Sequence, residues 1–296
     1  MDLFEYAFML RALTGALIIG LAAPALGTYL VQRRLSLIGD GIGHVALTGV
    51  GVGLLLERSP VITAVIVAAA GAVGVELVRE RGRTSGDLAL AMLFYGGIAG
   101  GVVLVGLSHG SSNASLIQYL FGSLTTTSDA DIVVISVLGA AVLAAMLLLR
   151  PALFAVCNDE EYARVSGLPV RTLNLLLAVT TAVTVTIAMR TVGLLLVSAL
   201  MVVPVAAAQQ ITRGFRTTMT AAMLIGLVSA AAGVVASAEL DTAPGATIVI
   251  LALVVFVGLT AGAAAWRLTG ARTRRTRNAE PAGLASPEPP DVVLHG

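Results

Sequence analysis

The sequence predicts an all-α protein that crosses the plasma membrane about nine times. Apolar residues make up 57% of the 296 positions and charged residues only 12%, whereas a soluble domain carries about 25% charged residues. The apolar residues form continuous runs instead of alternating with polar ones, which argues against a closed β-barrel. Several runs reach the roughly 20 residues that a membrane-spanning helix needs.

Nine apolar segments are long enough to cross the bilayer. They lie at roughly 8–31, 37–56, 60–78, 87–107, 131–149, 171–189, 192–211, 217–237 and 245–266. The first is interrupted by Arg11 and could instead lie along the membrane surface, which would leave eight spans. We expect residues 1–267 to form one transmembrane domain.

The distribution of arginines predicts the orientation of these spans. All 18 basic residues are Arg, and only Arg11, Arg58 and Arg190 fall on one side of the bilayer, while the other 15 fall on the opposite side. Loops on the cytoplasmic side carry an excess of basic residues. We therefore place the arginine-rich side and the C-terminus in the cytoplasm, and the N-terminus outside.

The tail, the single cysteine and the absence of enzyme motifs limit the functions that this chain can have. Residues 268–296 are rich in Arg, Pro, Ala and Gly, so we expect a disordered basic tail. The single Cys157 excludes an internal disulfide and a CxxC site. No Walker A, HExxH or GxSxG sequence occurs, which argues against ATP hydrolysis by this chain and against the usual hydrolases. We expect no nucleic-acid partner.

Asp40 and His44 lie one helical turn apart in the otherwise apolar stretch QRRLSLIGDGIGHVALTGVGVG. Residues four positions apart share one face of a helix, and a carboxylate with a neutral imidazole can bind zinc, manganese or iron. The alternative is structural: Asp40 caps the helix and His44 donates to a backbone carbonyl. Two ligands do not complete a metal site, so the others must come from elsewhere or from water.

The longest cytoplasmic connection, RPALFAVCNDEEYARVSGLPVRT, contains a candidate docking element. Asp159 can cap a short helix with Glu161 in its first turn, and Gly167 followed by Pro169 ends that helix. A short helix outside the bilayer is suited to binding a soluble partner. A simple surface helix between two spans explains the pattern equally well.

Two acidic residues are expected at the outer face. Glu239 and Asp241 precede Pro244 in SAELDTAPGATIVI, where the last span begins. Acids in this position could attract cations into a vestibule. Capping of a helix end is an equally good explanation.

Three segments together resemble the membrane subunits of ABC importers for manganese, zinc and iron. RRLSLIGDGIGHVALTGVGVG resembles the start of span 2 in that family, and LDTAPGATIVILALVVF resembles the opening of its last span. DEEYARVSGLPVRTLNLLLAVTTAVTVTIAMRTVGLLLVSALMVVPVAAAQQIT resembles its cytoplasmic coupling helix and the two spans that follow. The resemblance runs from about Glu5 to Trp266, with the segments in the same order and at the same spacing.

The resemblance implies a permease subunit whose cargo is zinc or manganese, with iron as a third candidate. It implies no permanently bound cofactor. Its implied partners are a cytoplasmic ATP-binding subunit, an extracellular metal-binding lipoprotein, a second copy of the chain and the lipid bilayer. Asp40 and His44 match the family's metal pathway. The DEEYARVSG segment corresponds to the helix in the ATPase groove. The resemblance therefore implies that Glu160, Glu161, Ala163 and Gly167 contact the ATPase and that Asp159 belongs to the same coupling element. One departure is that Gly41 and Gly43 stand between the two ligands, which is expected to loosen the helix.

Two rival functions stay open at this point. A permease for a metal chelate or a vitamin would share the docking segment but would not depend on Asp40 or His44. An intramembrane enzyme could use the same pair as acid and base, although the sequence contains no nucleophile motif.

Overall fold

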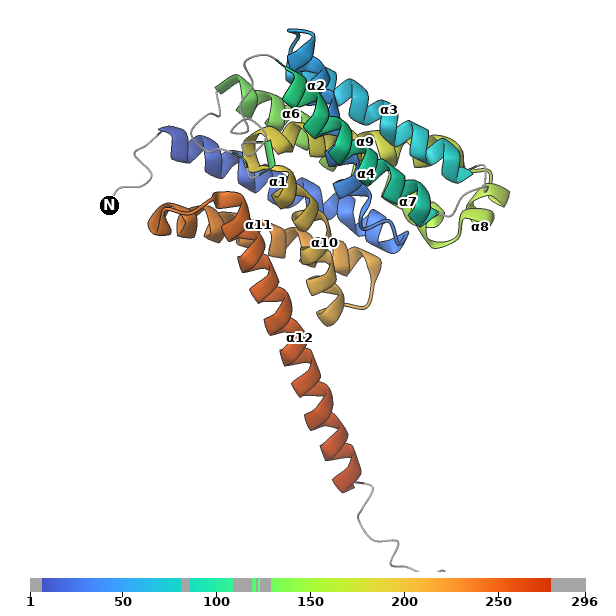
Figure 1. Cartoon of the computed structure of the whole chain (residues 1–296). Coiled ribbons are helices and arrows are strands. Elements are labelled where there is room, and N and C mark those ends of the chain that lie inside the picture. The colour runs from blue at the N-terminus through green and yellow to red at the C-terminus, as the bar shows by residue number, and fades with distance from the viewer. Residues whose placement is uncertain (1–6, 81–85, 109–118, 121, 123–128, 278–296) are drawn as a thin grey trace, which may run out of the picture.

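The described part of the chain is built from helices. The computed structural model describes residues 7–80, 86–108, 119, 120, 122 and 129–277, and within them it contains no strand. The helices in chain order are α1 (Ala7–Gln32), α2 (Ile38–Leu55), α3 (Pro60–Glu80), α4 (Gly86–Leu107), α6 (Asp129–Leu148), α7 (Arg150–Asn158), α8 (Glu160–Val165), α9 (Val170–Val192), α10 (Leu194–Ile211), α11 (Phe215–Leu240) and α12 (Pro244–Arg277) (Figure 1).

Nine of these helices, all except α7 and α8, are long and apolar enough to cross a membrane. The all-α fold class with nine spans is therefore confirmed for the described residues. The first span is a continuous helix despite Arg11, whose guanidinium contacts Asp129 at the start of α6 at 3.2 Å. This ion pair between two helix ends compensates the charge that made the first span uncertain.

The last helix extends further than the sequence indicated. The predicted tail begins at residue 268, whereas α12 continues to Arg277. Figure 1 shows that the second half of α12 extends away from the other helices. Residues 278–296 lie outside the described part of the chain, so the predicted disorder of the tail stays a prediction.

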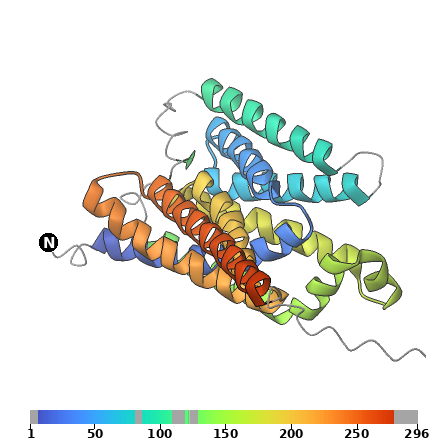
Figure 2. The same ribbon diagram turned by 90° about the horizontal axis from the view of Figure 1, so that it is seen from below.

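The spans form two groups that meet at α9 and where α2 contacts α10. In the first group α2 packs against α3 and α4, and in the second α1 packs against α6, α10 and α11, with α12 on α10 and α11. Helix α9 contacts members of both groups. Figure 2 shows the blue-to-teal helices α2, α3 and α4 on one side of the bundle and α11 and α12 on the other.

Small residues bring the helices of each group into backbone contact. A Cβ atom at Gly49 of α2 would lie 2.6 Å from the Cα of Ala64 in α3. In the second group, a Cβ at Gly20 of α1 would lie 2.9 Å from the carbonyl oxygen of Gly226 in α11. Close backbone approach through small residues is a main source of helix association in lipid, so each group is tightly packed.

Candidate functional site

Asp40 lies in the first turn of α2, near enough to His44 to interact with it electrostatically. The helix begins after Leu37, which makes no side-chain capping bond, and the Asp40 carboxylate forms no hydrogen bond or ion pair with a described residue. The structure therefore does not show the alternative explanation from the sequence, in which the Asp40 side chain caps α2 with a hydrogen bond. An ionisable group costs about 2.5–3.5 kcal/mol at the centre of a membrane helix on insertion scales. Asp40 lies at the end of its span, but a carboxylate without a hydrogen bond there still needs an explanation.

His44 lies one turn further along α2 and is also poorly satisfied. Its Nδ1 is buried without a hydrogen-bond partner among the described residues. The imidazole stands edge-on to the ring of Phe94 in α4, with the ring centroids 4.7 Å apart and the planes at 81°. A Cβ at Gly97 would lie 2.6 Å from the His44 carbonyl carbon, so α4 fixes the backbone at this point.

Two pockets meet at Asp40. One, of about 340 Å³, is lined on the α4 side by Leu90, Phe94 and Tyr95. The other, of about 470 Å³, is lined by residues of α2, α10 and α12. It includes Ser198, whose buried hydroxyl also has no hydrogen-bond partner in the described chain. Asp40 therefore borders a pocket on each side, and only the second pocket contains a buried polar group without a hydrogen-bond partner in the described chain, the Ser198 hydroxyl; His44 lines neither pocket.

The described residues do not complete a metal site around this pair. No group of three or more His, Cys, Asp or Glu side chains that could hold a metal lies within the parts of the chain that the structure describes.

Helix α2 is regular across Gly41 and Gly43, and both glycines are buried. A Cβ at Gly41 would lie 3.2 Å from Leu90 Cδ1. The glycines therefore allow close packing, and the expected loosening of the helix is not observed.

The predicted short helix is present as α8. The Asp159 carboxylate accepts a hydrogen bond from the backbone N–H of Tyr162 at 2.9 Å, which is the capping geometry expected from the sequence. Gly167 follows the helix with φ of +81°, a conformation that favours glycine. The short capped helix is therefore confirmed, while its role in binding a partner is not tested by this geometry.

The side chains of α8 point in two directions. Ala163 is fully buried, and Glu160 is half-buried against arginines of other helices. Tyr162 and Val165 are 68% and 88% exposed, next to the exposed Glu161. Tyr162 and Val165 were not among the predicted docking residues, although two large apolar residues three positions apart in a short polar helix share one face and indicate a contact surface.

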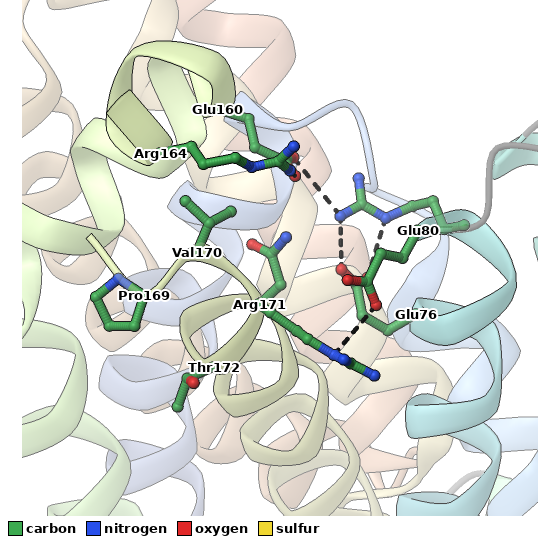
Figure 3. Close-up of a pocket in the computed structure, with 10 residues that line it drawn as sticks. Glu76, Glu80, Glu160, Arg164, Pro169, Val170, Arg171 and Thr172 are labelled. Carbon is green, nitrogen blue, oxygen red and sulfur yellow. Dashed lines mark hydrogen bonds and ion pairs between the residues drawn. The ribbon is translucent and has the colours of Figure 1, made fainter. Parts of the chain in front are cut away.

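A cluster of charged side chains connects α8 to the membrane helices. We call it the Arg–Glu cluster; it consists of Arg33, Glu76, Arg79, Glu160 and Arg164, and it borders a pocket of about 520 Å³ (Figure 3). Arg79 donates to both carboxylate oxygens of Glu76, at 3.0 and 2.7 Å. Glu76 is an acidic residue within the apolar third span. This signal could have indicated the cluster but was not used in the prediction from sequence.

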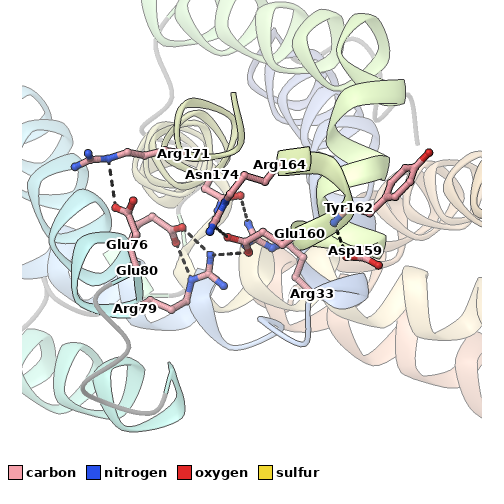
Figure 4. Close-up of polar contacts among 10 residues, drawn as sticks. All are labelled: Arg33, Glu76, Arg79, Glu80, Asp159, Glu160, Tyr162, Arg164, Arg171 and Asn174. Atoms are coloured by element: carbon pink, nitrogen blue, oxygen red, sulfur yellow. Dashed lines mark hydrogen bonds and ion pairs between the residues drawn. The ribbon is translucent and has the colours of Figure 1, made fainter. Parts of the chain in front are cut away.

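The edges of the Arg–Glu cluster are fixed by further polar contacts. Arg33 donates to Asn174 of α9 at 2.8 Å, and Arg171 contacts Glu80 at 3.3 Å (Figure 4). Burial lowers the pKa of Arg33, and the neighbouring Arg79 lowers it further. Burial also raises the pKa of the Cys157 thiol to about 11, although Arg33 and Arg79 act in the opposite direction.

Glu239 and Asp241 are exposed where α11 ends. Asp241 occupies the C-cap position with φ of +49°, and its backbone N–H donates to the carbonyl oxygen of Ser237. Asp241 therefore caps the end of α11 through its backbone, which agrees with the helix-capping explanation offered from the sequence. The exposure of both carboxylates is also compatible with attraction of cations.

Comparison with known proteins identifies the family. The profile described as "ABC 3 transport family" matches residues 5–262. The manganese transport system membrane protein MntC of Halalkalibacterium halodurans is 31% identical over 255 residues, which cover 86% of this chain and 87% of that relative. The high-affinity zinc uptake system membrane protein ZnuB of Haemophilus influenzae is 29% identical over 255 residues, 86% of this chain and 97% of the relative.

A solved structure agrees with these relatives. PsaBC from Streptococcus pneumoniae in complex with Fab aligns with a TM-score of 0.77 at 26% identity, covering 87% of this chain and 92% of that chain. The spans and the sequence relatives define this chain as a membrane-spanning transport subunit of the plasma membrane. It belongs to the ABC 3 transport family.

Proposed function

We propose that this chain is the permease subunit of an importer that moves a divalent transition-metal ion into the cell, with zinc or manganese as the first candidates and iron as the third. The observation that carries this proposal is the Asp40 carboxylate, which makes no hydrogen bond or ion pair with the described chain, one turn from His44, whose Nδ1 has no hydrogen-bond partner there. A divalent cation in transit would neutralise the carboxylate and accept the imidazole nitrogen as a ligand. The names of the manganese and zinc relatives support the same class of cargo.

The site is proposed to be shared by two copies of the chain. Leu37 and Tyr95, which line the pocket at Asp40, are 63% and 70% exposed. A carboxylate that opens onto lipid is costly, so we expect a second copy to cover this surface. Water or the second copy's Asp40 and His44 would supply the missing ligands. Binding is expected to be modest in affinity, because the ion must also leave.

Helix α8 is proposed to bind the ATP-binding subunit and to transmit its movements to the spans. Tyr162 and Val165, with Glu161 beside them, present the surface that a cytoplasmic ATP-binding subunit would contact, while Asp159 and Gly167 fix the two ends of the helix. The transport cycle would alternate access between the two sides of the membrane. At the outer face, Glu239 and Asp241 would attract cations delivered by an extracellular metal-binding lipoprotein.

Uptake of radioactive zinc and manganese by cells that lack their own importers tests the proposed function. The chain is produced with its ATP-binding and metal-binding partners, as wild type and as the variants D40A and H44A. We expect uptake to fall at least tenfold in both variants, while assembly with the ATP-binding subunit is retained. S36A is the matched control, because Ser36 lines the pocket at Asp40 without belonging to the pair. Normal uptake in D40A and H44A would remove the pair from the ion path.

A further inference from the structure

Glu160 connects α8 to two different parts of the bundle. Its Oε2 lies 3.3 Å from Nη2 of Arg33, which directly follows α1, and 4.0 Å from Nη2 of Arg79 in α3. Its Oε1 lies 3.4 Å from Arg164 on α8 itself. Figure 4 shows the carboxylate between the guanidinium groups of Arg33 and Arg79. A single side chain of α8 therefore contacts the end of one helix of each group.

Both arginines are firmly anchored where they meet Glu160. The Arg33 side chain is only 6% exposed and also donates to Asn174 of α9. Arg79 is held by two hydrogen bonds to Glu76, whose side chain is 7% exposed. Buried charges keep their positions only while their partners are present. Removal of the Glu160 carboxylate would leave Arg33 and Arg79 without the counter-charge that they share.

Each arginine belongs to a tightly packed group of spans. Arg79 lies on α3, which is in backbone contact with α2 through Gly49 and Ala64. Arg33 follows α1, which is in backbone contact with α11 through Gly20 and Gly226. A displacement of Arg79 is therefore passed to the helix that carries Asp40 and His44, and a displacement of Arg33 to the opposite group.

We propose that Glu160 is the positioning residue that transmits movement of α8 to both groups of spans. The inference rests on the proposed function, because it assumes that an ATP-binding subunit moves α8. When α8 is displaced, Glu160 changes the separation of Arg33 and Arg79, and the two groups change their relative position at this end of the bundle. Glu160 thus acts inside the permease, in contrast to the exposed Tyr162 and Val165.

The test measures metal uptake and ATP hydrolysis together in liposomes that contain the complete complex. We expect E160Q to lower the number of ions imported per ATP hydrolysed at least tenfold, while ATP hydrolysis stays within twofold of wild type. E80Q is the matched control: Glu80 borders the same pocket and pairs with Arg171 of α9, but it forms no ion pair with α8. E80Q is expected to keep the wild-type ratio.

The outcomes separate this inference from the proposed function. If the wild-type complex imports no metal, the proposed function itself is wrong. If the wild type imports metal and E160Q does so at the normal ratio, only the role of Glu160 is overturned. An equal loss of hydrolysis and uptake in an assembled E160Q complex would also overturn it, because Glu160 would then act on the ATPase directly.

A second variant covers the case in which E160Q does not assemble. E160D keeps the negative charge but is one methylene shorter, so it cannot keep both contacts at their present distances. We expect E160D to assemble and to lower the ratio of ions to ATP by at least threefold. A wild-type ratio in E160D would overturn the proposal.

Discussion

The Asp40–His44 pair and the Arg–Glu cluster are both polar regions in an apolar bundle, but they differ in how they are satisfied. Within the Arg–Glu cluster, Glu76 and Arg79 form two hydrogen bonds and Glu160 contacts three arginines. Asp40 makes no hydrogen bond or ion pair with the described chain, and Nδ1 of His44 has no hydrogen-bond partner there. Satisfied polar groups hold a structure together, whereas an unsatisfied one needs an explanation, and a bound ion is the one proposed for this pair. The difference predicts that substitutions will damage stability in one region and transport in the other.

Removal of Arg79 should have the largest effect on stability. R79A leaves the buried Glu76 carboxylate without its two hydrogen bonds, which costs about 3–5 kcal/mol in buried ion pairs. We expect the lower end of that range, because the Arg79 side chain is 24% exposed. Thermal unfolding of the purified chain in detergent measures the change. The double variant E76L/R79M should recover most of the loss, and a loss below 1 kcal/mol in R79A would show that Glu76 finds another partner.

The exposed face of α8 should matter for assembly and not for stability. Tyr162 and Val165 are largely exposed, so Y162A/V165A should leave the unfolding temperature of the isolated chain unchanged. Loss of two apolar anchors from an interface is expected to weaken binding of the ATP-binding subunit by about 2 kcal/mol. Co-purification at graded concentrations measures this. Undiminished binding would mean that α8 does not dock through this face.

The sequence predicted local features and missed contacts between distant segments. The nine spans, the capped α8 and the shared face of Asp40 and His44 depend on hydrophobic runs, a capping residue and helical spacing, which are all local. Arg33 meets Asn174 across 141 residues of sequence and Glu160 across 127. No local pattern encodes such a pairing, because it arises only when α1, α8 and α9 pack. Of the cluster, only Glu76 carries a local signal, as an acid in an apolar run, and that signal was overlooked.

Cys157 offers a chemical probe of the Arg–Glu cluster. Its pKa is raised to about 11 by burial, and the Glu160 carboxylate also raises it. Because the thiolate is the reactive form, alkylation should be slow at pH 7 and should speed up about tenfold per pH unit below the pKa. E160Q removes a group that raises the pKa and leaves Arg33 and Arg79, which lower it, so alkylation at pH 8 should be faster than in wild type. Mass spectrometry measures the rate, and slower alkylation would contradict the assignment.

The raised pKa of Cys157 also predicts that the folded chain becomes less stable at alkaline pH. A thiol whose pKa is raised from 9.0 to about 11 on folding keeps its proton in the folded chain over a range where the unfolded chain loses it. The free energy of unfolding should therefore fall between about pH 9 and pH 11 and be unaffected by this group below pH 9. C157S should remove this part of the pH dependence.

Substitution of Asp40 should have the smallest effect on stability. D40A removes a carboxylate that makes no hydrogen bond or ion pair with the described chain, so only its favourable interaction with the N-terminus of α2 is lost. The free energy of unfolding should fall by less than about 1 kcal/mol, and it should rise instead if burial of the charge is costly. Thermal unfolding of D40A beside R79A makes the comparison direct. A loss above 2 kcal/mol in D40A would mean that Asp40 has a structural partner, and the contrast between the two regions would fail.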